Sequence, residues 1–417
     1  MRPRQILSFF LTLFFFHFSY GQDLEYARKS LTTLTSPEFS GRGYVKHGDR
    51  KAAEFIASEF DRLGLEKFSK NYFQQYTFPI NTFPSEVEVK VDDKTLVPGA
   101  DFLVAANSKG MEGTFDLVWV LDTGLNLAAL QKKVNELDLK NKFLVTIKQN
   151  DLVKGATLDN VKGVILLRDK GLVWSVSAAH STRDLMVLEV LADKLPLEAK
   201  KISLNIDNHF YKKYHTQNVI AYIKGSLKPD SFLVFTAHYD HLGMMGTAFF
   251  PGANDNASGT SMILDLARYY SLPENKPKFS MVFMAFSGEE AGLLGSTYYV
   301  SDPLFPLKSI RFLVNLDMVG TGSSGIKVVN GASFANEFNR LSVLSKEKKY
   351  LKDVGIRGPS SHSDHHPFFE KGVPAVFIYT TGDEFKEYHN IYDVPAKLPF
   401  TKYNEVFHLL TDFVKTF

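Results

Sequence analysis

The second half of the chain alternates continuous apolar runs with segments of helical periodicity. The runs NVIAYI, SFLVFTAH and FSMVFMAFS have the length of single strands, and their lack of polar alternation predicts that both faces of each strand are buried. Residues 258–270, between the last two runs, have the apolar spacing of an amphipathic helix. Strand, helix and strand in this order predict a right-handed parallel crossover.

The same alternation continues to the end of the chain. It includes the runs FLVNLDMVG and PAVFIYTTG, a predicted helix near 334–347 and a closing helix at 401–415. We therefore predict an α/β fold in which a doubly wound, mixed but mainly parallel sheet carries helices on both faces.

The first half of the chain has two different patterns. Residues 23–78 are mostly helical, whereas at about 81–208 short β-rich pieces such as EVEVKV, KFLVTI and KISLNI alternate with polar connections and one helical stretch. We predict that 22–80 is the N-terminal helical part of the same domain as 209–417, and that 81–208 is an inserted β-rich domain.

Residues 1–21 have the pattern of an export signal. Arg2 and Arg4 precede a phenylalanine-rich apolar run at 6–18, and small residues follow before Gln22. The run is shorter than the ~20 residues that span a bilayer, so we expect no stable membrane anchor. The chain has no cysteine, which excludes a lipidated N-terminus and disulfides. We expect cleavage near Gly21 and a periplasmic or secreted protein.

Charge and length narrow the class of protein further. The formal net charge is +2 for 417 residues, and loss of Arg2 and Arg4 with the signal would bring it to about zero. This balance gives no indication of a nucleic acid partner or an anionic membrane surface. The length fits two domains, and the oligomeric state stays unknown.

Three signatures concentrate the chemistry of the chain: FTAHYDHLG at 235–243, GANDNASG at 252–259 and FSGEEAGLLGS at 286–296. Each follows or borders an apolar run, and side chains just past the ends of adjacent parallel strands converge on one crevice. Two divalent ions ~3.5–4 Å apart need a bridging carboxylate and terminal carboxylate and imidazole ligands. The candidate ligands are His238, Asp255, Glu290, Asp317 and His389. With Asp255 as the bridge, these residues form two three-ligand sites, although the sequence does not assign the other four to either site.

Ordinary structural roles are the alternative for single residues. Asp255 is compatible with a turn, the pair Glu289–Glu290 with a helix N-terminus, and His389 with the surface. Asp317 has no comparable structural explanation, because burial of a carboxylate inside an apolar strand costs free energy unless a partner compensates its charge.

In this order, HYDHLG, GANDNASG, SGEEAGLLGS, NLDMVG and YHNIYD resemble the signatures of the co-catalytic zinc exopeptidases of metallopeptidase family twenty-eight. That family includes secreted aminopeptidases, glutamate carboxypeptidases and glutaminyl cyclases. The resemblance implies the phosphorylase/hydrolase-like fold of zinc exopeptidases and two Zn²⁺ per chain. His238 would bind one zinc and His389 the other, Asp255 would bridge them, and Glu290 and Asp317 would complete the two sites.

The resemblance also implies roles around the metals. Glu289 would be the general base, Asp240 would orient His238, and the hydroxyl of Tyr388 would polarise the reacting carbonyl. Asp364 and His365, in SSHSDHHPF, would line the substrate site. The peptide bond after the bridging aspartate would be cis. We interpret His241, His215 and His180 as structural or surface residues.

The expected activity is hydrolysis of the terminal amide bond of peptides. Export and a complete ligand set favour an aminopeptidase. A carboxypeptidase would need an arginine for the substrate carboxylate, with Arg311 and Arg357 as candidates, and cyclases usually lack a large insertion. A metal-free binding protein on the same fold is the alternative from another class. The insertion weakly resembles a protease-associated domain and is either a lid that limits substrate size or a stabilising accessory.

Overall fold

A computed structural model describes residues 21–122, 126–147 and 161–417, so residues 1–20 of the predicted export signal lie outside the described part. Its larger region is built on an eight-stranded sheet. In spatial order the strands are β1 (Phe73–Thr82), β10 (His209–Ile223), β14 (Phe279–Phe286), β11 (Lys228–His238), β15 (Ile310–Leu316), β18 (Ala375–Thr381), β16 (Gly325–Val329) and β17 (Val354–Ile356).

The sheet is mixed, as the sequence predicts. The central strands β14, β11, β15 and β18 are parallel to one another, while β1, β10 and β14 pair antiparallel and β16 pairs antiparallel to β18. The short strands β16 and β17 lie at the end of the sheet and were not predicted. They were missed because their apolar runs are brief and lack the length of a buried central strand.

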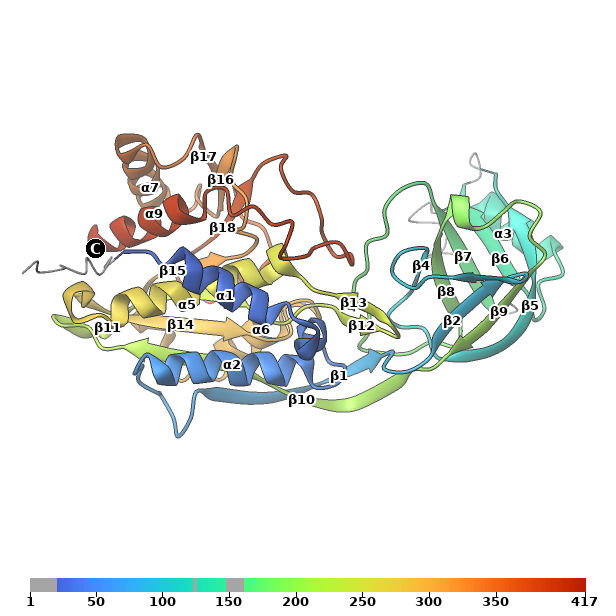
Figure 1. Cartoon of the computed structure of the whole chain (residues 1–417), viewed down its shortest axis with the longest axis horizontal. Helices are drawn as coiled ribbons and strands as arrows, with labels where there is room; N and C mark the ends of the chain where they lie inside the picture. Colours follow the sequence, from blue (N-terminus) through green and yellow to red (C-terminus); the bar gives the residue numbers. More distant parts are fainter. Residues whose placement is uncertain (1–20, 123–125, 148–160) are drawn as a thin grey trace, which may run out of the picture.

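Helices cover both faces of this sheet, and the alternation of side chains along β14 shows why (Figure 1). Phe279, Met281, Phe283 and Ala285 join one apolar core, whereas Val282, Met284 and Phe286 join another on the opposite face. The first core also contains residues of α1 (Leu24–Leu34), α2 (Gly48–Arg62), α5 (Ser258–Ser271), α7 (Ala335–Lys348) and α9 (Tyr403–Lys415). The second contains residues of α6 (Leu294–Ser301) and α8 (His365–Glu370). The predicted doubly wound α/β fold is confirmed.

A second eight-stranded sheet is formed within the predicted insertion. Its strand order is β3 (Lys94–Leu96), β2 (Val87–Val91), β9 (Lys201–Ile206), β5 (Met111–Val120), β6 (Phe143–Ile147), β7 (Gly163–Arg168), β8 (Met186–Leu191) and β4 (Phe102–Val104), with helix α3 (Leu127–Glu136). The β-rich pieces EVEVKV, KFLVTI and KISLNI lie on β2, β6 and β9. The division of the chain at 81 and 208 stays a proposal.

The second sheet shares an apolar core with a hairpin of the larger region. A hairpin, β12 (Gly243–Met245) and β13 (Ala248–Phe250), leaves the end of β11 and extends toward the second sheet (Figure 1). Met245 and Phe250 of this hairpin belong to the same buried cluster as Val89, Trp174 and Leu188 of the insertion. The long strands β1 and β10, which pair from 73 to 82 and from 209 to 219, also join the two parts. The insertion is therefore packed against the segment that connects two of the sequence signatures.

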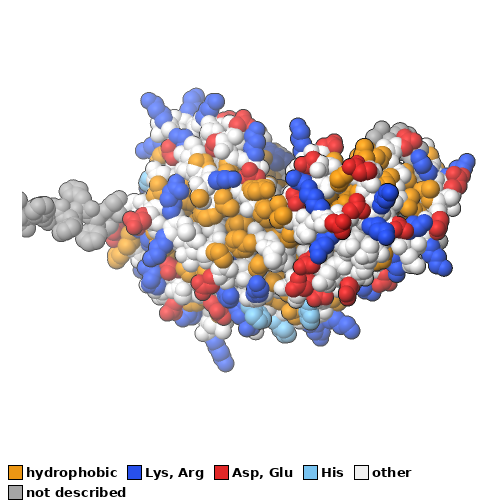
Figure 2. Space-filling view, turned by 45° about the vertical axis from the view of Figure 1, so that its right-hand side comes forward, with side chains coloured by type: hydrophobic (Ala, Val, Ile, Leu, Met, Phe, Trp, Pro, Cys, Tyr) orange, Lys and Arg blue, Asp and Glu red, His pale blue; other side chains and the backbone are white. Residues whose placement is uncertain are grey.

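Neither charge dominates the face of the molecule that Figure 2 shows. Figure 2 shows basic and acidic side chains interspersed over one face of both parts, in agreement with the nearly balanced charge of the sequence. No described helix is both long enough and apolar enough to cross a bilayer.

The shared core predicts that one buried ring stabilises both parts. Phe250 is fully buried and stacks on Trp174 with ring centroids 4.9 Å apart. Replacing Phe250 by Ala should lower the free energy of unfolding in urea by about 3–5 kcal/mol. The control Val343→Ala, at a site that is 53% exposed, should change it by less than about 0.5 kcal/mol. A Phe250→Ala effect as small as that of the control would contradict the shared core.

Candidate metal centre

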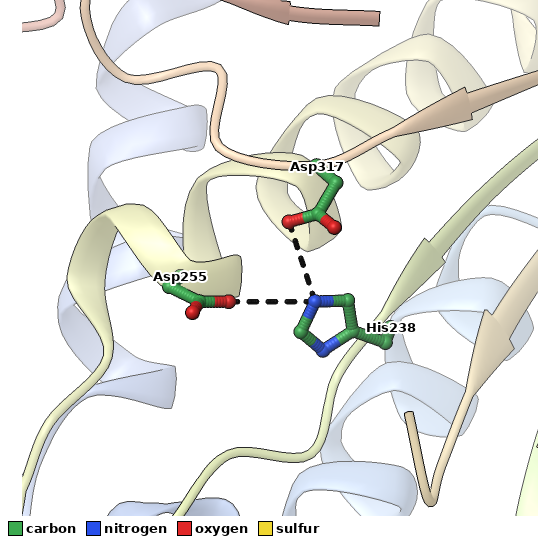
Figure 3. Close-up of side chains that lie close together, drawn as sticks. All are labelled: His238, Asp255 and Asp317. Atoms are coloured by element: carbon green, nitrogen blue, oxygen red, sulfur yellow. Dashed lines mark hydrogen bonds and ion pairs between the residues drawn. The ribbon is translucent and has the colours of Figure 1, made fainter. Parts of the chain in front are cut away.

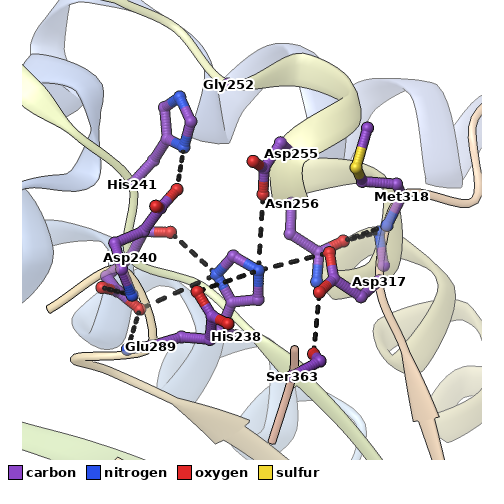
Figure 4. A network of polar contacts seen from close by, with 12 residues as sticks. His238, Asp240, His241, Gly252, Asp255, Asn256, Glu289, Asp317, Met318 and Ser363 are labelled. Atoms are coloured by element: carbon purple, nitrogen blue, oxygen red, sulfur yellow. Dashed lines mark hydrogen bonds and ion pairs between the residues drawn. The ribbon is translucent and has the colours of Figure 1, made fainter. Parts of the chain in front are cut away.

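The candidate site lies at the carboxyl ends of the central parallel strands. His238 is the last residue of β11, Glu289 and Glu290 follow β14, and Asp317 comes directly after β15. Asp255 lies in the turn that leads into α5. Parallel strands end at the same edge of a sheet, so these side chains meet there (Figure 4). The structure brings together all five predicted ligands.

The first group consists of His238, Asp255 and Asp317, all buried (Figure 3). The Nε2 atom of His238 lies 3.3 Å from Oδ1 of Asp317 and 3.4 Å from Oδ1 of Asp255. One imidazole nitrogen and two carboxylate oxygens that converge in this way form a donor set suited to a divalent metal.

The second group lies on the other side of Asp255. Its Oδ2 atom is 3.0 Å from Nε2 of His389, and the same nitrogen is 3.1 Å from Oε2 of Glu290. Asp255 therefore presents one oxygen to each histidine, which is the geometry that a bridging carboxylate requires.

His241 also belongs to this second group. Its Nδ1 atom lies 2.7 Å from Oε1 of Glu290, and its ring is fully buried. His241, Asp255 and Glu290 have ligand atoms within 4.8 Å of one another. His241 thus contacts the predicted ligand Glu290, and its interpretation as a structural residue stays a prediction; its place three residues after His238, just past the same strand, is the signal that could have indicated this contact.

Asp240 contacts the site differently from the predicted arrangement. Nδ1 of His238 lies 3.2 Å from the main-chain oxygen of Asp240, whereas the nearer carboxylate oxygen is 3.8 Å away. The carboxylate instead accepts hydrogen bonds from the Tyr44 hydroxyl at 2.7 Å and from the N–H groups of Glu289 and Glu290 at 3.2 and 3.4 Å. Its main chain thus orients His238, and its side chain fixes the turn that carries the two glutamates.

Of the predicted catalytic residues, Glu289 and Tyr388 are partly exposed to solvent. The Glu289 side chain is 14% exposed, with Oε2 4.0 Å from Nε2 of His238. Burial, together with the neighbouring carboxylates of Glu290 and Asp317, raises the pKa of Glu289 well above its ordinary value. The ring of Tyr388 stacks on His389 at 3.8 Å and is 43% exposed.

Buried carboxyl groups dominate the electrostatics of the site. Burial opposes the charged form of both His238 and His389, but nearby carboxylates outweigh it. They hold the pKa of His238 well above its usual range and raise that of His389 to about 11. Burial would raise the pKa of Glu290, yet His389 and His241 hold it well below the ordinary value. The donor set therefore fits two divalent cations.

Asp364 and His365, the predicted substrate-binding residues, lie inside the protein. Both are fully buried at the start of α8. Burial raises the pKa of Asp364 to about 7, and burial lowers that of His365 to about 4. Neither side chain reaches the surface, so their substrate-binding role stays a prediction. The preceding residue, Ser363, donates a hydrogen bond of 2.7 Å to Oδ2 of Asp317 and was missed by sequence reasoning.

Two buried charged residues that the sequence did not single out support the Asp255 turn. Arg42 donates to the carbonyl oxygens of Tyr239 at 2.7 Å, Pro251 at 2.6 Å and Gly252 at 2.8 Å. Asp393 accepts from the N–H groups of Asn254 at 2.8 Å and Asp255 at 3.1 Å. The Asp255–Asn256 peptide bond is cis. In the sequence, the SGRG segment that contains Arg42 indicates only a polar loop. The carbonyl groups that Arg42 binds lie far away in the chain and leave no pattern in the sequence.

Gly252 is needed in the same turn. Its φ is +60°, and a Cβ atom there would lie 2.2 Å from the main-chain oxygen of Asp255 and 2.4 Å from the ring of His241. Both conformation and space therefore restrict this position to glycine.

The Arg42 contacts predict a specific loss of stability. In Arg42→Lys the charge is retained, but a single ammonium group cannot reach carbonyls that lie in different directions. We expect the free energy of unfolding to fall by about 3 kcal/mol or more, since buried carbonyl groups lose their donors. Chemical denaturation should show no comparable loss for the control Arg62→Lys, whose side chain is 54% exposed.

Known proteins resemble the chain in both sequence and structure. Residues 218–414 match the sequence model of Peptidase family M28. Aminopeptidase YwaD of Bacillus subtilis is 35% identical over 188 residues, which cover 43% of this chain and 39% of that protein. A glutamate carboxypeptidase 2 homolog of Caenorhabditis elegans is 31% identical over 231 residues, which cover 48% of this chain and 29% of that protein. The matches thus span less than half the length of these curated relatives.

Solved structures share the fold over almost the whole chain. BSAP, a zinc aminopeptidase from Bacillus subtilis, superposes with a TM-score of 0.73 at 24% identity, covering 95% of each chain. The aminopeptidase from Aneurinibacillus sp. strain AM-1 gives a TM-score of 0.65 at 22% identity, covering 95% of this chain and 94% of that one. At these identities the likeness concerns the fold. Residues 218–414 therefore match Peptidase family M28 in sequence, and the solved zinc aminopeptidase shares the fold that carries this segment.

Proposed function

We propose that the protein is an exported, two-zinc exopeptidase that removes N-terminal residues from peptides. The observation that carries this proposal is the position of Asp255, which presents one oxygen to His238 and the other to His389. With Asp317 on one side and Glu290 on the other, each site has three protein ligands, the number typical of catalytic zinc. The zinc metalloproteases among the relatives support the choice of metal. Export rests on the sequence pattern of residues 1–21.

The residues around the metals have separable tasks. Bound zinc ions would supply electrophilic activation of the scissile carbonyl and of the attacking water. Glu289, whose Oε2 lies 4.0 Å from Nε2 of His238, accepts a proton from that water and donates it to the leaving amine. The Tyr388 hydroxyl donates a hydrogen bond to the carbonyl oxygen as negative charge develops there. Asp240 holds the main chain of Glu289 in place for this transfer.

The surroundings of the candidate arginines favour an aminopeptidase over a carboxypeptidase, which would need a free arginine for the substrate carboxylate. The arginines considered for a substrate carboxylate have other partners. Arg311 lies near the start of β15, about 20 Å along that strand from Asp317, and packs on Phe279 and Phe417.

Arg357 and Arg42 do not favour a carboxypeptidase either. Arg357 donates a hydrogen bond of 2.8 Å to the Tyr379 hydroxyl. Arg42 is fully buried and bonded to main-chain carbonyls. Carboxypeptidase activity is retained as a second candidate because of the 31% identity to the glutamate carboxypeptidase 2 homolog.

A panel of free, N-blocked and C-blocked peptides tests the proposal directly. Release of N-terminal residues from free and C-blocked peptides, lost on chelation and restored by zinc, is the expected result. Release of C-terminal residues would favour the second candidate, and pyroglutamyl products from N-terminal glutamine peptides would indicate a cyclase. If the purified protein contains no zinc and releases no residue from any of these peptides, a metal-free binding protein would be indicated.

Glu289→Gln separates proton transfer from metal binding. The amide keeps the size of the side chain but cannot accept the proton, so kcat should fall by a factor of about 100–10,000 or more. Zinc content measured by elemental analysis should stay at the wild-type value. The matched control Glu274→Gln, at an exposed position, should leave both quantities unchanged. Wild-type kcat in Glu289→Gln would remove Glu289 from the general-base role.

Zinc binding should release protons. In the metal-free protein the pKa of His389 is about 11, so its imidazole is protonated at pH 7. Zinc needs the lone pair of Nε2, so affinity should rise with pH as this proton becomes easier to remove. Calorimetry at pH 7 in buffers of different ionisation enthalpy should detect release of about one proton or more per chain. His389→Ala should lower that number, and an unchanged value would contradict this assignment.

A further inference from the structure

A segment of the inserted region, residues 172–179, reaches the metal centre through Trp174. The main-chain N–H of Trp174 donates to the main-chain oxygen of His389 at 2.9 Å, and Nδ1 of His389 lies 2.9 Å from the main-chain oxygen of Trp174. Because a carbonyl oxygen can only accept, the hydrogen of this second bond resides on Nδ1. The other ring nitrogen, Nε2, is then directed at Asp255 and Glu290.

Trp174 is itself held by both parts of the molecule. Its indole N–H donates to the main-chain oxygen of Val104, on β4 of the second sheet, at 2.8 Å. Its ring stacks on Phe250, on β13, and only 5% of the residue is exposed. The position of the Trp174 main chain is therefore fixed by the core that the second sheet shares with the β12–β13 hairpin.

His389 depends on this support more than His238 does. His238 ends a central strand, and its Nδ1 contacts the main chain only two residues further along the chain. His389 lies in the irregular segment between β18 and α9, with a φ of +51°. No helix or strand of its own sequence neighbourhood fixes the direction of its ring. A partner on the second nitrogen of a metal-binding histidine sets the tautomer and orientation of the ring.

We propose that Trp174 is a positioning residue for His389, and that the inserted region is thereby a structural part of the second metal site. The inference rests on the proposed two-zinc function and assigns the insertion a task beyond covering the site or limiting substrate size. It predicts that disturbing Trp174 weakens one zinc site selectively, although Trp174 contributes no ligand atom.

The two tryptophans of the chain provide a matched pair of variants. Trp119 lies on β5 of the second sheet and donates its indole N–H to the main-chain oxygen of Ala199 at 3.1 Å. In Trp174→Ala we expect zinc affinity at the weaker site to fall about 10–100-fold, so that about one zinc remains after dialysis. The value of kcat should fall with little change in KM. Trp119→Ala should retain two zinc ions, and Trp174→Phe, which keeps a ring on Phe250, should recover part of the affinity.

A fluorescence measurement tests the contact between Trp174 and His389 without measuring enzyme activity and without replacing Trp174. In Trp119→Phe, Trp174 is the sole tryptophan and reports on its surroundings. Titration of the metal-free protein with zinc should change its emission as the second site fills. Adding His389→Ala should abolish that change while one zinc still binds. A zinc-dependent change that persists without His389 would overturn the proposed coupling.

The results of these experiments show whether this inference or the proposed function is wrong. If the wild type binds two zinc ions and Trp174→Ala and Trp174→Phe bind both with unchanged affinity, the inference is wrong and the proposed function stands. If the wild type binds no zinc, the proposed function is wrong and the inference fails with it. If Trp174→Ala does not fold, the phenylalanine variant and the fluorescence titration decide.

Discussion

The excess of carboxyl groups buried at one edge of the central sheet is the constraint on which the rest of the site depends. Asp240, Asp255, Glu290, Asp317 and Asp364 are buried there, and Glu289 is nearly so. Carboxylates taken out of water and placed beside one another are stable only with cations or strong hydrogen-bond donors close by. The histidines supply part of that charge, and two divalent cations would supply the rest.

Rigid secondary structure elements position the carboxyl groups at this edge of the sheet. Strands β11, β14 and β15 end together, so His238, the glutamate pair and Asp317 project from fixed points. The Asp255 turn is irregular, and its main chain is held from outside by Arg42 and Asp393. The Asp240 carboxylate does the same for the glutamate turn. Precise ligand placement thus comes from a layer of main-chain hydrogen bonds around the ligands.

The inserted region belongs to this supporting layer in our proposal. Its core includes the β12–β13 hairpin, which connects the signature containing His238 to the one containing Asp255. Through Trp174 it also reaches the loop of His389. An accessory domain with these contacts can influence metal affinity as well as substrate access. The two effects are distinguishable because only the first changes zinc content.

The sequence by itself determined the architecture and the ligand types. Apolar runs of strand length and amphipathic helices are local patterns, so the mixed α/β sheet and its two helical layers follow from them. The signatures stand at the ends of strands of one sheet, and this pattern alone predicts that His238, Glu290 and Asp317 share a common edge. The order of the signatures likewise indicated the family.

Only the tertiary structure decided which groups surround the ligands. Arg42 and Asp393 are 351 positions apart (393 − 42), yet both bind the Asp255 turn, and Trp174 meets His389 across 215 residues. His241 belongs to the second group through a contact with Glu290 that is 49 residues distant in the chain. These contacts use main-chain carbonyls and N–H groups, which nearly every residue possesses, or pair residues far apart in the chain. The main-chain contacts of Arg42, Asp393 and Trp174 leave no mark on residue type or spacing, so folding alone reveals them.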